Sequence, residues 1–158
     1  MFRPLRRKSN AISDEGAREV LLRGRRGILA VNGDDGYPFA LPVNYVFDAE
    51  ANRIYFHGAK AGHKVDSLRR DDRVCFTVIG EDIRVEGEWA PYVRSTVAFG
   101  RCHLIEDREL TVEKVRELAL KYYPDPAEAQ AEVAKGAAAA QLYQIDIEHL
   151  CGKQIQER

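Results

Sequence analysis

The sequence predicts a mainly β fold, a closed or split antiparallel barrel of Greek-key-like character with appended helices. Short segments rich in β-formers follow one another closely, turn residues separate them, and only a few helical segments interrupt them. Closely spaced strands pair antiparallel, because parallel neighbours need long crossovers. This pattern favours a barrel over a doubly wound sheet.

The composition is that of an ordinary globular protein. A chain of 158 residues can bury a real core, and we expect residues 1–158 to form one domain. The 24 basic and 25 acidic side chains nearly cancel, so no overall field favours nucleic acid or an anionic membrane. No segment has membrane-spanning length, and the three cysteines suggest neither disulfides nor a metal knuckle. We expect a cytoplasmic protein that binds neither nucleic acid nor membrane.

The first third of the chain predicts a helix and a hairpin. The helix should begin after Ser13, a good N-cap, and end at Gly24. A strand over 27–31 then leads through a glycine-containing turn to a second arm over 37–47. Two prolines in that arm withhold amides from a sheet, which indicates an edge strand, a bulge or a functional interruption.

The remaining elements follow in short succession. Further strands are predicted over 53–57, 73–79, 83–89, 95–105 and 142–147. A glycine loop and a short helix that ends at Arg70 come after the first of these. Two more helices are predicted, over 109–123 and in the alanine-rich segment 127–140.

The loop over 57–64, His-Gly-Ala-Lys-Ala-Gly-His-Lys, has the chemistry of an anion site. Glycines let backbone amides approach a phosphate, while the N-terminus of the following helix and a lysine add positive charge. A strand-to-helix loop also uses glycine and lysine merely for turning and solvation, and the segment matches neither Walker A nor GxGxxG. His57 and His63 lack the partners of a zinc site, so we expect no metal. His57 fits a hydrogen-bonded structural histidine better than a catalyst.

Two further segments suggest ligand contacts. Pro42 interrupts the pairing of its strand, and Asn44 can both donate to and accept from a heteroaromatic ring, although a structural proline in an edge strand explains the same pattern. Near 94–96, a guanidinium and two hydroxyls suit phosphate oxygens, and they equally suit salt bridges and turn caps. Trp89 with Tyr92 could stack on a ligand, but closing one end of the barrel is the simpler interpretation.

In order and spacing, these segments resemble the FMN-binding split-barrel proteins related to pyridoxamine 5′-phosphate oxidase, most closely the branch that includes nitroimidazole-resistance proteins. The segments that carry the resemblance are 6–8, 37–45, 54–59, 62–64, 73–76, 94–95 and 152–153. They extend over nearly the whole chain. The match therefore concerns an ordered set of motifs rather than a single loop.

The resemblance implies a homodimer with two FMN molecules in grooves at the interface, so that both chains supply contacts. It assigns Lys64, Arg94 and Ser95 to the FMN phosphate, and it places the segment 42–45 beside the isoalloxazine. The full set of cofactor-binding residues that it implies is Pro42, Val43, Asn44, Tyr45, His57, Gly58, Ala59, Gly62, His63, Lys64, Arg94 and Ser95. No proton donor is assigned, and His57 is the nearest catalytic candidate.

The function implied by the resemblance is that of an FMN-dependent oxidoreductase. It would take electrons from a reduced nicotinamide and reduce a small flat acceptor such as a nitro-aromatic. Because the sequence has no obvious acid, base or nicotinamide motif, a non-catalytic flavin-binding module for sensing or storage stays open. A split barrel that uses deazaflavin or haem is a further alternative. Oxidation of pyridoxamine phosphate itself is not expected, since the C-terminus lacks an arginine- and histidine-rich substrate motif.

Overall fold

The computed structural model describes residues 2–137 and 139–157. The strands are β1 (Arg26–Asn32), β2 (Pro38–Asn44), β3 (Val46–Asp48), β4 (Arg53–Gly58), β5 (Arg73–Ile83), β6 (Tyr92–Ile105) and β7 (Gln141–Gln156). The α-helices are α1 (Asp14–Arg23), α2 (His63–Arg70), α3 (Arg108–Tyr122) and α4 (Pro126–Gly136), and the two short 3-10 helices are η1 (Lys8–Asn10) and η2 (Asp34–Gly36).

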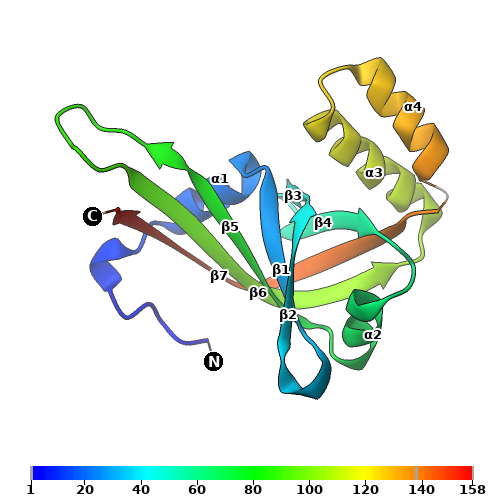
Figure 1. Cartoon of the computed structure of the whole chain (residues 1–158), viewed down its shortest axis with the longest axis horizontal. Helices are drawn as coiled ribbons and strands as arrows, with labels where there is room; N and C mark the ends of the chain where they lie inside the picture. The colour runs from blue at the N-terminus through cyan, green and yellow to red at the C-terminus, as the bar shows by residue number, and fades with distance from the viewer. Residues whose placement is uncertain (1, 138, 158) are drawn as a thin grey trace.

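The strands form one antiparallel sheet in the order β2-β1-β5-β6-β7-β4-β3. This sheet curls into a half-barrel (Figure 1). Helices α3 and α4 lie beyond one end of it, and the hairpin between β5 and β6 extends from the opposite end. The predicted fold class, mainly β with appended helices, is confirmed. None of the described helices is long and apolar enough to cross a membrane.

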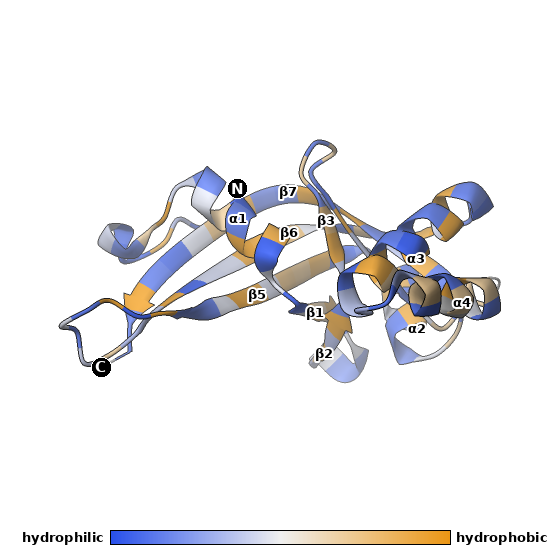
Figure 2. Ribbon diagram, turned by 90° about the horizontal axis from the view of Figure 1, so that it is seen from above, coloured by the Kyte–Doolittle hydropathy of each residue, from blue (hydrophilic) through white to orange (hydrophobic). Residues whose placement is uncertain are grey.

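The inner face of the curled sheet carries the hydrophobic core. Hydrophobic and hydrophilic positions are interspersed along the strands, as expected where alternate side chains face opposite sides of a sheet (Figure 2). Leu29, Phe56, Phe76 and Tyr143 are fully buried, and the rings of Phe56 and Tyr143 stack with centroids 4.8 Å apart. These large side chains fill the space that the curl encloses.

Helix α1 closes the core on one side, as the sequence predicts. The Ser13 hydroxyl accepts a hydrogen bond from the Gly16 amide at 3.1 Å, which caps the helix start. The buried face of α1, Ala17, Val20 and Leu21, packs toward β5, β6 and β7. The helix predicted between Ser13 and Gly24 is confirmed.

Two strand predictions are wrong, because each missed a change of direction. The arm predicted over 37–47 is divided at Tyr45, so that β2 pairs with β1 whereas β3 pairs with β4. The segment 83–89 is not a strand of its own: Gly87 has a φ of +85°, and the chain reverses there into an exposed hairpin tip. Trp89 is 77% exposed on this tip, so it does not close an end of the barrel.

Smaller differences concern the last elements. The final strand is much longer than the predicted 142–147, since β7 pairs with β6 up to Gln156. The alanine-rich helix ends at Gly136 rather than at 140, and Ala138 lies outside the described residues. In α3, Val115 is buried whereas Val112 is 41% exposed.

Tyr45 forms the corner that brings the two edges of the sheet together. It alone separates β2, one edge strand, from β3, the other. Its side chain is fully buried, its hydroxyl donates to the Leu21 carbonyl at 2.7 Å, and its ring meets Phe76 edge-on with centroids 5.0 Å apart. The corner is therefore tied to both α1 and the core.

We expect Tyr45→Phe to lower the free energy of unfolding by about 1–3 kcal/mol, because the buried Leu21 carbonyl loses its partner. Urea denaturation followed by circular dichroism measures this change. Tyr37→Phe is the control, since Tyr37 is 76% exposed and its loss should have no measurable effect. Equal stabilities of the Tyr45→Phe variant and the wild type would contradict the assigned role.

Candidate functional site

The loop between β4 and α2 has a backbone suited to holding an anion. Gly62 is the N-cap of α2 and has a φ of +112°, a conformation that favours glycine. No side chain caps the helix there, so the amides of its first turn keep their donors available. Free amides at a helix N-terminus attract negatively charged groups.

Lys64 lies in the first turn of α2 and has an unusual setting. Its ammonium lies over the Tyr143 ring at 4.2 Å and over the Phe56 ring at 5.2 Å. Partial burial lowers the pKa of Lys64. Among the described residues, no carboxylate forms an ion pair with it. A Cβ atom at Gly58 would lie 2.7 Å from Lys64 Nζ, so the glycine leaves room for the lysine.

The two histidines of the loop have different surroundings. His57 is the second-last residue of β4 and lies near the surface, where partial burial of its ring and the charge of Lys64 lower its pKa. The His63 ring stacks on Phe39 of β2 with centroids 4.2 Å apart, and its Nε2 lies 3.3 Å from an Asp34 carboxylate oxygen. The His63 side chain thus fastens α2 to the β1–β2 hairpin.

Ala59 contributes to the loop through its backbone. Its carbonyl accepts a hydrogen bond from the Tyr143 hydroxyl at 2.6 Å, which fixes the chain just after β4. Tyr143 therefore supports the loop twice, by this bond and by its ring beneath Lys64.

The segment 42–45 lies on edge strand β2 and at the corner after it. Pro42 pairs in register with Ile28 of β1, so the proline occupies an edge strand without breaking the ladder. The side chains of Pro42 and Asn44 are exposed, whereas Val43 packs against the core. The expectation for the Tyr45 side chain needs correction, because a fully buried side chain cannot border a ligand.

Arg94 and Ser95 lie far from this loop within the same chain. Their side chains leave opposite faces of β6: Arg94 donates to Gln154 at 2.8 Å, while Ser95 lies with Ile79 and Lys153 on the outer face. His57, where the loop begins, pairs with Leu142 of β7, and Leu142 pairs with Ile105 of β6. Ile105 is therefore the residue of β6 that lies level with the loop. Residues 94 and 105 are 11 positions apart, or roughly 36 Å along the strand.

Beside Arg94 the surface is hollowed into a groove of about 690 Å³. The C-terminal end of α1, the start of β1 and the end of β5 form its walls. Its charged lining residues are Glu19, Arg23, Arg25, Arg26, Glu81, Asp82 and Arg94. Because acidic and basic side chains both line the groove, its charge does not indicate whether a ligand there would be an anion or a cation.

Sequence reasoning missed the side chains that organise the candidate site. Lys121 and Tyr122 of α3 hold the corner at Tyr45, and Asp34 pairs with both His63 and Arg70. These contacts join residues that lie far apart along the chain, and no local pattern indicates them. Across the described residues, no group of three potential ligands could hold a metal ion.

Solved structures share this architecture at low sequence identity. A proposed 5-nitroimidazole antibiotic resistance protein from Bacteroides thetaiotaomicron is 17% identical, with a TM-score of 0.76 over 92% of this chain and 87% of its own. The flavocytochrome Anf3 from Azotobacter vinelandii is 24% identical, with a TM-score of 0.76 over 96% of this chain and 72% of its own. An FAD-binding protein from Mesorhizobium loti is 22% identical, with a TM-score of 0.67 over 92% and 96%.

No curated protein sequence matches this chain significantly. The family model described as pyridoxamine 5′-phosphate oxidase matches residues 13–154, which is nearly the whole chain and includes every predicted site residue. The chain therefore belongs to the pyridoxamine 5′-phosphate oxidase family and has its split-barrel fold.

Proposed function

We propose that this protein binds FMN and acts as an FMN-dependent oxidoreductase. The observation that carries the proposal is Lys64, a half-buried lysine without a carboxylate partner among the described residues, at the uncapped N-terminus of α2. A cation in this position lacks a counter-charge, and a phosphate would supply one.

The loop suits a phosphate in backbone conformation as well as in charge. Gly58 and Gly62 keep side chains away from the backbone, and the uncapped amides of α2 point outward from the helix start. Lys64 would move from the aromatic rings toward the bound phosphate and form a charge-assisted hydrogen bond. His63 would contribute through its backbone, because its side chain is held by Phe39 and Asp34.

Strand β2 is suited to the ring of a flavin. As an edge strand it has backbone donors and acceptors that β1 does not pair, and Asn44 adds an exposed amide side chain. Phe39 on the same strand contacts His63, so β2 and the loop lie next to each other. A bound flavin would supply two-electron redox chemistry, while the protein would orient it and control access to it.

The proposed substrates come from the relatives. One structural neighbour is described as a proposed 5-nitroimidazole resistance protein, and others bind FAD or FAD with haem. We propose a reduced nicotinamide as the electron donor and a small flat acceptor, such as a nitro-aromatic, as the substrate. The assignment to FMN rather than FAD follows the family resemblance, which assigns Lys64, Arg94 and Ser95 to the FMN phosphate.

We further propose that two copies form a homodimer and share the cofactor sites. Lys64 and Arg94 of one chain lie at opposite ends of the sheet, so one phosphate cannot contact both. If both residues bind the phosphate, they must come from different copies. Contacts from two chains would also bring Ser95 to the site, since it lies on the outer face of the sheet.

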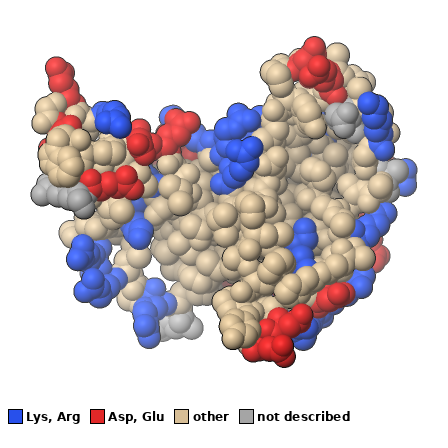
Figure 3. Space-filling model, in the orientation of Figure 1, with Lys and Arg blue, Asp and Glu red and all other residues tan. Residues whose placement is uncertain are grey.

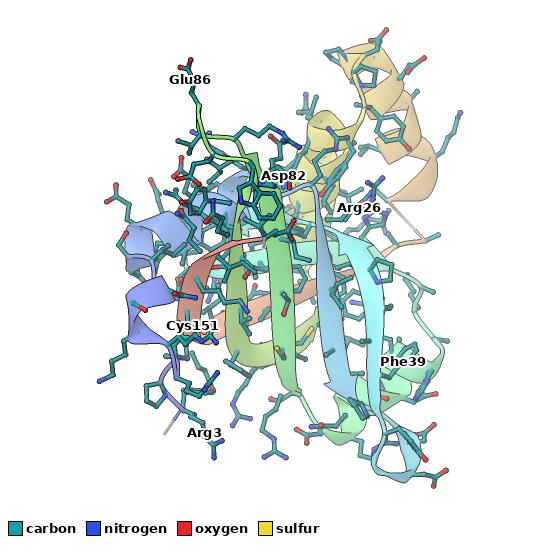
Figure 4. The ribbon with its side chains drawn as sticks, turned by 60° about the vertical axis from the view of Figure 1, so that its left-hand side comes forward. Arg3, Arg26, Phe39, Asp82, Glu86 and Cys151 are labelled. Atoms are coloured by element: carbon teal, nitrogen blue, oxygen red, sulfur yellow. The ribbon has the colours of Figure 1, made fainter. Side chains whose placement is uncertain are left out.

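The outer face of the sheet suits such a dimer. Two complete rows of paired residues cross β2, β1, β5, β6 and β7, and neither row contains Asp, Glu, Lys or Arg. The rows are Pro42, Ile28, Thr77, Val97, Cys151 and Ala40, Ala30, Cys75, Phe99, His149. Figure 4 looks toward these strands, and in Figure 3 the middle of the molecule is mostly uncharged. Because 31% of the residues in the chain are charged, an outer face with two uncharged rows stands out from the rest of the surface. Such a face is suited to contact with a second copy.

We expect the purified protein to bind FMN, and Lys64→Gln to weaken this binding about 10- to 100-fold, because a charge-assisted bond to the phosphate is lost. Absorbance titration of the flavin-free protein measures the affinity. Lys60→Gln is the matched control from the same loop and should bind as the wild type does.

The same preparation separates the alternatives. Anaerobic bleaching of the bound flavin by NADH or NADPH supports the oxidoreductase, whereas FMN binding without bleaching by either donor favours a sensing or storage module. Mass spectrometry of the released ligand distinguishes FMN from FAD, deazaflavin and haem. A wild type that binds no FMN would overturn the proposal.

We expect Val97→Glu to convert the dimer to a monomer and to reduce FMN binding, because Val97 lies at the centre of the uncharged face and a buried carboxylate is costly. Light scattering after size-exclusion chromatography measures the mass. Val112→Glu on α3 is the control, since that side chain is already 41% exposed. A monomeric wild type at micromolar concentration would exclude the shared site.

We expect the imidazole of His57 to titrate below 6.5 in the flavin-free protein, because burial and the Lys64 charge disfavour its protonation. Lys64→Gln should raise this pKa, and a bound phosphate should raise it as well by offsetting the lysine charge. Proton NMR titration measures the midpoint, with His57→Gln to assign the signal and Lys60→Gln as the control. An unchanged midpoint in Lys64→Gln would place Lys64 away from His57.

A further inference from the structure

We propose that Lys121 and Tyr122, at the C-terminal end of α3, are positioning residues for the flavin ring. They hold the peptide groups on both sides of Tyr45 and thereby fix the end of β2 that would border the ring. This inference rests on the FMN site proposed above. It adds a part of the chain that none of the site motifs includes.

The contacts at the corner come from two adjacent side chains. The Lys121 ammonium donates to the Gly24 carbonyl at 2.7 Å and to the Tyr45 carbonyl at 3.0 Å. The Tyr122 hydroxyl oxygen lies 3.0 Å from both the amide nitrogen and the carbonyl oxygen of Tyr45, and it also contacts the Arg25 carbonyl. One helix end therefore binds the start of β1 and the end of β2 together.

These contacts to the peptide groups add to those that the Tyr45 side chain makes with Leu21 and Phe76. Strand β2 is held by β1 on one side, while its other side is an edge. Its last residue, Asn44, pairs with Arg26, so any movement of the β1 start would move β2 as well. Because Lys121 binds Gly24 and Tyr45 while Tyr122 binds Arg25 and Tyr45, the two side chains oppose this joint movement. The exposed donors and acceptors near Asn44 then keep a defined position.

The charge of Lys121 strengthens the contacts that it and Tyr122 make with Tyr45. Burial, together with the nearby Arg25 guanidinium, lowers the pKa of Lys121 to about 8, so the ammonium is still the main form at neutral pH. Its Nζ lies 4.3 Å from the Tyr45 ring centroid and 5.6 Å from that of Tyr122. The Arg25 guanidinium in turn lies 5.4 Å from the Tyr122 ring. Cation–π contacts thus add to the hydrogen bonds.

The test compares removal of the Tyr122 hydroxyl with removal of the neighbouring Tyr123 hydroxyl. Tyr122→Phe removes the bonds to Tyr45 but keeps the ring, and Tyr123→Phe is the matched control, since Tyr123 is 43% exposed. We expect Tyr122→Phe to weaken FMN binding about tenfold and to shift the visible spectrum and midpoint potential of bound FMN. Inhibition of FMN binding by inorganic phosphate should keep its wild-type concentration dependence, because the α2 loop is unchanged.

Each outcome decides between the two proposals. If the wild type binds no FMN, the function proposed above fails. If it binds FMN but Tyr122→Phe keeps wild-type affinity, spectrum and potential, the positioning role fails while the function stands. If Tyr122→Phe loses both its affinity for FMN and the inhibition of FMN binding by phosphate, the variant has lost structure generally. That result would also overturn the positioning role. Lys121→Met is tested at pH 7, with circular dichroism to confirm folding. It must likewise weaken FMN binding and shift the flavin spectrum and midpoint potential while phosphate inhibition stays unchanged.

Discussion

The structure depends on one corner, the single residue at which the chain passes from one edge of the sheet to the other. Tyr45 is buried there, and its hydroxyl, ring and peptide groups are all occupied by α1, the core and α3. An antiparallel sheet with seven strands has two exposed edges unless something joins them. Here both edges remain, but the chain passes directly from one edge strand to the other, and the buried Tyr45 holds that junction.

The candidate site follows from this closure. Because the sheet curls, β2 comes next to the β4–α2 loop, as the contact between Phe39 and His63 shows. The loop offers charge and backbone amides, and the edge strand offers unpaired backbone groups. Neither would form a site without the other. The closure of the barrel and the assembly of the site therefore depend on the same contacts.

Local patterns predicted most of the fold and part of the site. The Ser13 cap, the proline-bearing edge strand and the glycine loop before α2 are all features of short segments, and short segments can be recognised without knowing the rest of the chain. The hairpin at Gly87 was missed because alternating apolar and charged residues look the same in a strand and in an exposed loop. The burial of Tyr45 was missed because its partners lie on distant elements.

The site residues show the same limit. The residues that the family resemblance assigns to the phosphate lie at opposite ends of the sheet within one chain, and the strand register reveals their separation. A list of motifs has no spatial information about which copy supplies which residue. The strand register supports the proposal that two chains share each site.

The hairpin between β5 and β6 has a practical consequence for experiments. Trp89 is the only tryptophan in the sequence, and it lies largely in water near the tip of this hairpin, where Figure 4 also shows Glu86. Its indole already has a hydrated environment in the folded chain, so its emission colour changes little when the core melts. Indole fluorescence is thus a weak probe of global unfolding, but a sensitive local probe of any molecule that binds to the hairpin.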